Sequence, residues 1–283
     1  MYDIIVIGAG PAGLTAALYA LRASKSVLVI EQSTFGGQVT FSPKIENYPG
    51  IPEMSGNEFA DKLLDQVLSM GAEVEMEKVT GIVDEGNRKL VFADSKKYEA
   101  QAVIIAVGVH HRQLGLSNEN QLVGNGVSYC AVCDGFIYRK KRIALIGSGD
   151  YMKAELDVLK RFTKDLFVFT NGLDTDITDI EVIKDEIVEF SGDGVLKSII
   201  TNNNSYEVDA AFIAVGSQDT LSLAKHLGLI VDEKGDLIVT NSHTNISGIF
   251  AGGDCTQGVK QIVKAAADGC IAAYEIKEYL RGK

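Results

Sequence analysis

A glycine-rich turn near the N-terminus constrains the fold more than any other feature of the sequence. Residues 8–13 read Gly-Ala-Gly-Pro-Ala-Gly and directly follow the apolar run of residues 4–7. Between a buried strand and a helix, this G-x-G-x-x-G pattern permits a tight turn, close backbone approach to a pyrophosphate and close helix–strand packing. The next apolar strand ends in Glu31, where a carboxylate can bind a ribose. The sequence therefore predicts a binding site for an adenine dinucleotide.

The opening pattern returns in the second half of the chain. Residues 143–146 form another apolar run, and Gly147-Ser148-Gly149 follows it. The segment at 212–216 likewise repeats the pattern of residues 104–108. Self-similarity of this kind predicts two copies of one nucleotide-binding unit, of which the second is shorter.

The repeat predicts an α/β fold with two Rossmann-like dinucleotide-binding domains of the three-layer β/β/α type, the second inserted into the first. A length of 283 residues suits one large domain or two ordinary domains. We expect the first domain to comprise residues 1–110 and 242–283, and the central domain to comprise residues 111–241.

A cysteine pair in the central segment predicts redox chemistry. Cys130 and Cys133 are separated by two residues and followed by Asp134. A C-x-x-C pair reaches disulfide geometry easily, and its loop lowers the pKa of one thiol. Asp134 is placed to exchange a proton with a thiol or thiolate. Half of a zinc site is the alternative, but the other two cysteines, Cys255 and Cys270, are fifteen residues apart and supply no second ligand pair.

The amino-acid composition limits the classes of partner that the protein can bind and the cellular compartment in which it can work. The net charge of −11 argues against nucleic acid as the main partner, because phosphate binding needs a clustered basic surface. No apolar run is long enough to span a membrane. With only four cysteines, the C-x-x-C pair indicates a reducing compartment, and we expect a cytoplasmic protein without a metal site.

Taken together, these motifs resemble the low-molecular-weight thioredoxin reductases, which are FAD-dependent disulfide oxidoreductases. The similarity covers nearly the whole chain and depends on the order of the motifs. The motifs are the glycine turn at 8–13, Gly-Gly-Gln at 36–38, Glu-Asn-Tyr-Pro-Gly at 46–50, Cys-Ala-Val-Cys-Asp-Gly at 130–135 and Ala-Gly-Gly-Asp at 251–254.

The resemblance implies a cofactor site, a division of labour between the cysteines and a homodimer. Cys133 would face the flavin, Cys130 would attack the disulfide of thioredoxin, and Asp134 would be the acid or base. Asp254 would bind the ribityl chain of FAD, and Gln261 would lie beside the flavin. The residues implied to hold FAD are Gly8, Gly10, Ala12, Gly13, Glu31, Gln38, Asn47, Gly253, Asp254 and Gln261.

The second glycine turn departs from the pattern of the members that use NADPH. Tyr151 and Met152 stand where the first turn has Ala12 and Gly13, and their bulk should displace the helix or fill the space for a pyrophosphate. Thr170 occupies the position that corresponds to Glu31. No arginine or lysine occurs from residue 167 to 183, so a 2′-phosphate would have no cationic partner there.

These departures resemble the branch of ferredoxin-dependent flavin thioredoxin reductases, which do not use pyridine nucleotides. That resemblance implies that electrons pass from reduced ferredoxin through FAD to the cysteine pair and then to thioredoxin. Ferredoxins are usually acidic, so we expect a basic docking surface. Its candidate residues are 139–142, Lys160, Arg161 and Lys164. The alternatives are an NADPH-dependent thioredoxin reductase with an atypical cofactor site, and a flavin redox sensor.

Overall fold

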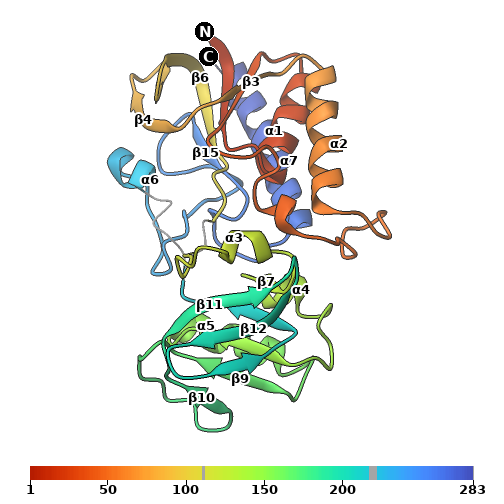
Figure 1. Cartoon of the computed structure of the whole chain (residues 1–283). Coiled ribbons are helices and arrows are strands. Elements are labelled where there is room, and N and C mark those ends of the chain that lie inside the picture. The colour runs from red at the N-terminus through yellow and green to blue at the C-terminus, as the bar shows by residue number, and fades with distance from the viewer. Residues whose placement is uncertain (110–111, 217–221, 283) are drawn as a thin grey trace. The chain divides into compact units, whose positions relative to one another are not determined.

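The computed structural model describes residues 1–109, 112–216 and 222–282, and it divides into two compact units. The first unit combines Met1–Val109 with Asp219–Lys283, and the second unit is His110–Gln218. The chain thus leaves the first unit once, builds the second and returns (Figure 1). Among the described residues, no helix is both long enough and apolar enough to cross a bilayer.

Asp219–Lys283 belongs to the first unit, whereas the sequence predicted that the second segment of this domain begins at residue 242. Leu229 and Leu237 belong to the same buried core as Val103 and Ile249 of the first unit. The segment that precedes residue 242 contains only short apolar runs, at residues 229–231 and 237–239, which by themselves do not indicate the core that they join.

A largely parallel sheet forms the centre of the first unit. Its strands lie in the order β3-β2-β1-β6-β5-β4, and β15 also pairs with β6. Ile5 lies opposite Leu28 on one side and Val103 on the other, so the predicted N-terminal strand is flanked on both edges. The elements of this unit are β1 (Tyr2–Ile7), α1 (Pro11–Arg22), β2 (Val27–Glu31), the 3-10 helix η1 (Gly37–Phe41), α2 (Gly56–Ser69), β3 (Glu73–Met76), β4 (Val79–Asp84), β5 (Lys89–Ala93), β6 (Lys97–Ile105), α6 (Ser222–Leu227), β15 (Ile249–Ala251) and α7 (Ile262–Arg281).

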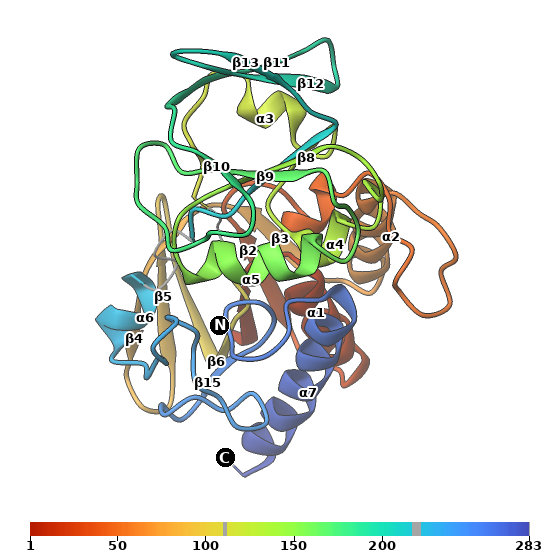
Figure 2. The ribbon, with the colours of Figure 1, turned by 90° about the horizontal axis from the view of Figure 1, so that it is seen from below.

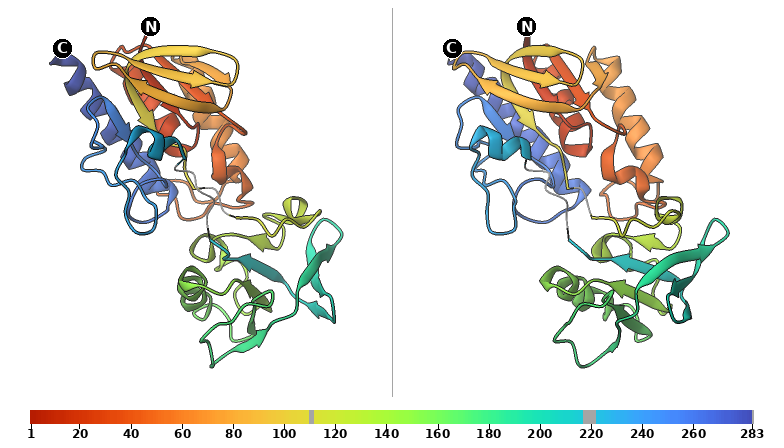
Figure 3. Two further views of the ribbon diagram at one scale, coloured as in Figure 1. Left: turned by 90° about the vertical axis from the view of Figure 1, so that its left-hand side faces the viewer. Right: turned by 60° about the vertical axis from the view of Figure 1, so that its left-hand side comes forward.

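The side chains of β1 point alternately into two different cores, and the first unit therefore has three layers. Ile4 and Val6 point into a core shared with α1 and α7, whereas Ile5 and Ile7 point into a core shared with β4 and β5. Helices α1, α2 and α7 accordingly cover one face of the sheet, and the antiparallel strands β4 and β5 belong to the other layer (Figure 3). This arrangement confirms the α/β fold.

Two sheets and one main helix build the second unit. A parallel sheet has the order β10-β9-β8-β14-β7, and an antiparallel sheet has the order β11-β12-β13. Helix α5 packs on one face of β8 through Met152 and Leu156, and Phe190 and Ile199 of the antiparallel sheet share the core on the other face. The elements are α3 (Glu119–Leu122), β7 (Val127–Ser128), α4 (Ala131–Asp134), β8 (Ile143–Ile146), α5 (Asp150–Leu159), β9 (Leu166–Phe169), β10 (Glu181–Ile183), β11 (Ile187–Gly192), β12 (Leu196–Thr201), β13 (Ser205–Glu207) and β14 (Ala210–Ile213).

Candidate active site

The first glycine turn has the geometry that a nucleotide site requires. Gly8 has φ +102°, and a Cβ there would lie 2.3 Å from the carbonyl oxygen of Ala106. A Cβ on Gly13 would lie 1.9 Å from the carbonyl oxygen of Gly8, so helix α1 can start this close to the strand only with glycine. Around Gly10, in contrast, the nearest atom would be 3.8 Å from a Cβ. The turn is therefore tightly packed at its ends and open at its centre.

Glu31 is fixed against this turn. Its Oε2 accepts the backbone N–H of Ala9 at 2.8 Å, and its Oε1 accepts the N–H of Ser33 at 2.9 Å. The side chain is buried at the end of β2, as expected for a ribose-binding carboxylate. Gly36 donates its N–H to the carbonyl oxygen of Ala9, so the Gly-Gly-Gln loop lies beside the same turn.

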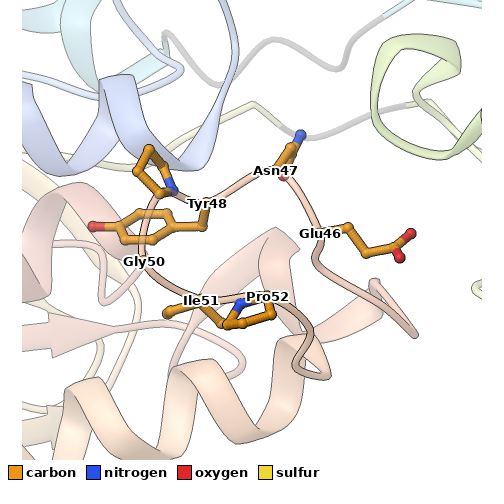
Figure 4. Close-up of a pocket in the computed structure, with 7 residues that line it drawn as sticks. Glu46, Asn47, Tyr48, Gly50, Ile51 and Pro52 are labelled. Atoms are coloured by element: carbon orange, nitrogen blue, oxygen red, sulfur yellow. The ribbon is translucent and has the colours of Figure 1, made fainter.

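Two predicted cofactor residues that are far apart in the sequence meet in the first unit. Asn47 Nδ2 donates to Gln261 Oε1 at 3.1 Å, which joins the 46–52 loop to the residue before helix α7. This loop lines a cavity of about 450 Å³ (Figure 4). In Figure 4, the side chains of Asn47 and Tyr48 point in directions that differ from that of the Glu46 side chain. Gln38, on η1, is exposed.

The Gly253-Asp254 segment lies on the start of helix α1. A Cβ on Gly253 would be 2.7 Å from the Cβ of Ala12, which places the last predicted motif directly beside the first. Burial raises the pKa of Asp254, and its Oδ1 is buried without a hydrogen-bond partner among the described residues. A buried acceptor without a donor is costly, so it is the kind of group that a ligand hydroxyl would satisfy.

The predicted cofactor residues of the first unit fit FAD. The central glycine exposes backbone for a pyrophosphate, the carboxylate of Glu31 is beside it, and the unpaired oxygen of Asp254 can accept from a ribityl hydroxyl. The individual contacts with FAD remain predictions.

Sequence reasoning missed the residues that hold the Gly253-Asp254 segment in place. Lys264 Nζ donates to the carbonyl oxygen of Gly253 at 3.1 Å and pairs with Asp268 at 2.7 Å. Asp268 in turn accepts the N–H of Gly253 at 2.8 Å. The spacing of Lys264 and Asp268, four residues apart on a helix, was the available signal, but it did not reveal that both side chains reach this loop.

In the second unit, Cys130 and Cys133 form a disulfide at the start of the short helix α4. Their Cα atoms are 5.3 Å apart, and the backbone N–H of Cys133 donates to Cys130 Sγ at 3.1 Å. Cys133 is exposed and Cys130 is half-buried. The pair is therefore accessible, while the identity of the sulfur that faces a flavin remains a prediction.

Asp134 is held beside the disulfide by a serine that the sequence analysis did not identify. Ser128 Oγ donates to Asp134 Oδ2 at 2.7 Å and accepts the N–H of Cys130 at 3.1 Å. Burial raises the pKa of Asp134, against the opposing effect of the Ser128 hydrogen bond. A carboxyl group that keeps its proton to a higher pH suits the predicted acid role.

The second glycine turn borders an open cavity of about 400 Å³. Met152 is fully buried in the core against β8 and does not line this cavity, so the expectation that it fills the pyrophosphate space is wrong. Tyr151 does line the cavity, and its hydroxyl donates to the carbonyl oxygen of Tyr129 at 3.2 Å. Thr170 also lines it, with a buried hydroxyl that has no partner among the described residues. The described lining includes no lysine or arginine.

Comparison with known proteins adds independent information. Residues 2–151 and 176–269 match the family described as pyridine nucleotide-disulphide oxidoreductase. A thioredoxin reductase of Listeria innocua is 36% identical over 302 aligned positions, covering 99% of this chain and 94% of that protein. A thioredoxin reductase of Bacillus subtilis is 35% identical, with 99% and 95% covered. The crystal structure of the Streptococcus pyogenes thioredoxin reductase superimposes with a TM-score of 0.93 at 34% identity, covering 100% of this chain and 99% of that one.

Proposed function

The chain belongs to the pyridine nucleotide-disulphide oxidoreductases and, within them, to the FAD-binding thioredoxin reductases, and we propose that it reduces thioredoxin or a thioredoxin-like protein through Cys130 and Cys133. The observation that carries this proposal is the accessible disulfide beside Asp134. Bound FAD would supply two electrons to this disulfide.

The local geometry supports Cys130 as the attacking sulfur. Two electrons open the disulfide, and the two protons that are taken up reside on Cys133 and Asp134, so that Cys130 is a thiolate whose negative charge the N–H of Cys133 can stabilise. The Cys130 thiolate then bonds to one sulfur of the thioredoxin disulfide, and the other sulfur leaves as a thiolate that takes the proton of Asp134. The Cys133 sulfur next attacks Cys130 and restores the internal disulfide, while the second thioredoxin sulfur leaves and takes the proton of Cys133. The net reaction converts one disulfide of thioredoxin into a dithiol.

Exposed apolar side chains beside the disulfide support a protein as the substrate. Val132, between the cysteines, is 54% exposed, and Phe136 is 58% exposed. Ile137 is also exposed. Apolar side chains gathered around an accessible disulfide are suited to contact a protein surface.

For the electron donor, we propose reduced ferredoxin. The described lining of the second cavity contains no lysine or arginine to bind a 2′-phosphate, and the nearby Lys153 and Lys184 are paired with Asp176 and Asp174. The expected basic surface is exposed, although Lys141, Arg142 and Lys160 each pair with an aspartate. The proposal depends on the lack of a lysine or arginine in the described lining of this cavity.

NADPH is the second candidate donor, and two observations favour it. The matched family is described by its pyridine nucleotide, and the match covers the second glycine turn as far as Tyr151. The cavity at that turn is open, since Met152 is in the core. The family match thus favours NADPH as the electron donor, whereas the side chains that line the cavity favour ferredoxin.

An anaerobic experiment separates the two donors. The FAD-loaded protein is mixed with reduced ferredoxin or with NADPH, and flavin absorbance is followed before and after addition of oxidised thioredoxin. We expect rapid bleaching only with ferredoxin, and new thiols on thioredoxin thereafter. Rapid bleaching by NADPH would refute the ferredoxin proposal and leave thioredoxin reduction intact.

The matched control is Cys133→Ser, which keeps the cofactor residues but removes the disulfide. This variant should still bleach with the correct donor and should produce no thioredoxin thiols. Thioredoxin reduction by the variant at the normal rate would contradict the role of the cysteine pair.

The assembly and location of the protein are further proposals. The resemblance to thioredoxin reductases implies a homodimer, which sedimentation of the FAD-loaded protein would test. A cytoplasmic location would supply the reducing conditions in which a C-x-x-C pair can cycle.

A further inference from the structure

Helix α5 holds the redox-active loop through two side chains on one of its faces. Tyr151 Oη donates to the carbonyl oxygen of Tyr129, the residue before Cys130. Glu155, four residues later, accepts the backbone N–H of Ala131, the residue after Cys130. Residues four apart lie on one face of a helix, so the two side chains hold both neighbours of the same cysteine. We call Tyr151 and Glu155 the loop clamp.

The carboxyl group of Glu155 is in an unusual environment for an acidic residue. Glu155 is 8% exposed, and it forms no ion pair with any described residue. Burial raises the pKa of Glu155, although the N–H of Ala131 favours the charged form. Acidic side chains are rarely buried without a cationic partner, because the loss of hydration is not compensated. A glutamine could accept the same hydrogen bond without this cost.

A negative charge at this place acts on the disulfide equilibrium. Reduction of the disulfide converts it into two thiols, one of which readily becomes a thiolate. Since the Glu155 carboxyl group is one hydrogen bond from the amide that follows Cys130, its charged form, which the N–H of Ala131 stabilises, opposes a thiolate on Cys130. A protein that destabilises its reduced form has a lower reduction potential and is a stronger reductant.

We propose that Glu155 is a positioning residue that orients the Cys130–Cys133 loop and, through its charge, makes this dithiol a stronger reductant of its substrate. The inference rests on the proposed thioredoxin reductase function, because it assigns the driving force of that reaction. It also gives helix α5 a role in the second unit that does not depend on the electron donor.

The test measures the disulfide equilibrium of the full-length, FAD-loaded protein without thioredoxin and without an electron donor. The protein is equilibrated at neutral pH with mixtures of reduced and oxidised dithiothreitol. When dithiothreitol reduces the Cys130–Cys133 disulfide, it is itself oxidised to a cyclic disulfide. Alkylation followed by mass spectrometry gives the fraction of each form. Glu155→Gln keeps the hydrogen-bond acceptor and removes the charge.

We expect E155Q to shift the equilibrium about tenfold towards the dithiol, which corresponds to about 30 mV in reduction potential. Asp157→Asn is the matched control, because Asp157 is an exposed carboxylate on the same helix, and its removal should change the equilibrium less than twofold. Equal equilibrium constants for wild type, E155Q and D157N would overturn the charge effect.

Tyr151→Phe tests the other half of the loop clamp. Because the Tyr151 side chain is half-exposed, removal of its hydroxyl should not prevent folding. We expect Y151F to raise the alkylation rate of the reduced cysteines several-fold at constant FAD content. An unchanged alkylation rate would overturn the clamp. If the wild-type protein shows no reversible disulfide at all, the proposed function itself fails, and this outcome is distinct from a failure of the Glu155 proposal.

Discussion

The contact between helices α1 and α7 offers a quantitative test of how the cofactor site is built. The two helices lie along each other in the first unit (Figure 2). A Cβ on Gly269 of α7 would lie 2.1 Å from the carbonyl oxygen of Ala12 and 2.9 Å from the backbone nitrogen of Ala16. Both atoms are backbone atoms, so no change of rotamer can relieve the contact. In Gly269→Ala, the helices must separate by about 0.9 Å before the first contact reaches 3.0 Å (3.0 − 2.1).

The free-energy cost follows from two opposing effects. Overpacking of a well-packed core costs ~1–3 kcal/mol, and the rigid contact places this variant at the upper end. Replacement of glycine by alanine inside a helix returns about 1 kcal/mol. The net loss of about 2 kcal/mol should lower the melting temperature by roughly 4–8 °C. Because Ala12 also touches Gly253, the displaced helices should weaken FAD binding as well.

Thermal unfolding by circular dichroism and the fluorescence of released FAD give the two readouts for G269A. Gly81→Ala is the control, since a Cβ on Gly81 would meet nothing within 4 Å. This control should change the unfolding free energy by less than about 0.5 kcal/mol. If G269A melts and retains FAD like G81A, close packing of the two helices does not support the cofactor site, and the reasoning is refuted.

Three further substitutions test individual side chains of the two sites. Burial raises the pKa of Asp254, so its ionised form costs folding free energy as pH rises through that pKa. Asp254→Asn should therefore stabilise the FAD-free protein at pH 7, lose this advantage in acid and bind FAD more weakly, which calorimetry would measure. Burial also raises the pKa of Asp134, and the proton it donates is lost as pH rises through that pKa. Asp134→Asn should slow thioredoxin reduction about 100-fold and remove this decline from the pH–rate profile, with FAD content unchanged. Lys264→Met should release Gly253 and lower FAD affinity about tenfold, because it removes charged hydrogen bonds worth ~1.5–3 kcal/mol. A fluorescence titration with FAD measures this affinity, and an unchanged value would contradict the role of Lys264.

The fold class and the chemical centre could be predicted because both depend on short, local patterns. An apolar strand followed by Gly8, Gly10 and Gly13 is restricted to one type of turn, since the glycines at both ends leave no room for a Cβ. Cys130 and Cys133 likewise are close in the sequence and therefore close in space. The start of helix α2 is local in the same way, because Ser55 Oγ accepts the N–H of Glu58, three residues later.

Tertiary structure alone decided the features that depend on residues distant in the sequence. The segment that contains Leu229 and Leu237 joins the first core through long-range packing, which no local pattern announces. Whether Met152 fills the cavity or the core depends on the direction in which helix α5 presents it, and only the packing against β8 determines this.

The same distinction holds for the partners of the functional groups. Glu155 is an ordinary helical glutamate in the sequence, and folding places it against the N–H of Ala131, 24 residues earlier in the chain. The unpaired oxygen of Asp254 is also a property of the fold, because burial depends on every neighbour at once. The sequence by itself thus determined which reactive groups are present. The tertiary structure determined their burial and partners, and hence their charge, because the free energy of a polar group depends on everything that surrounds it.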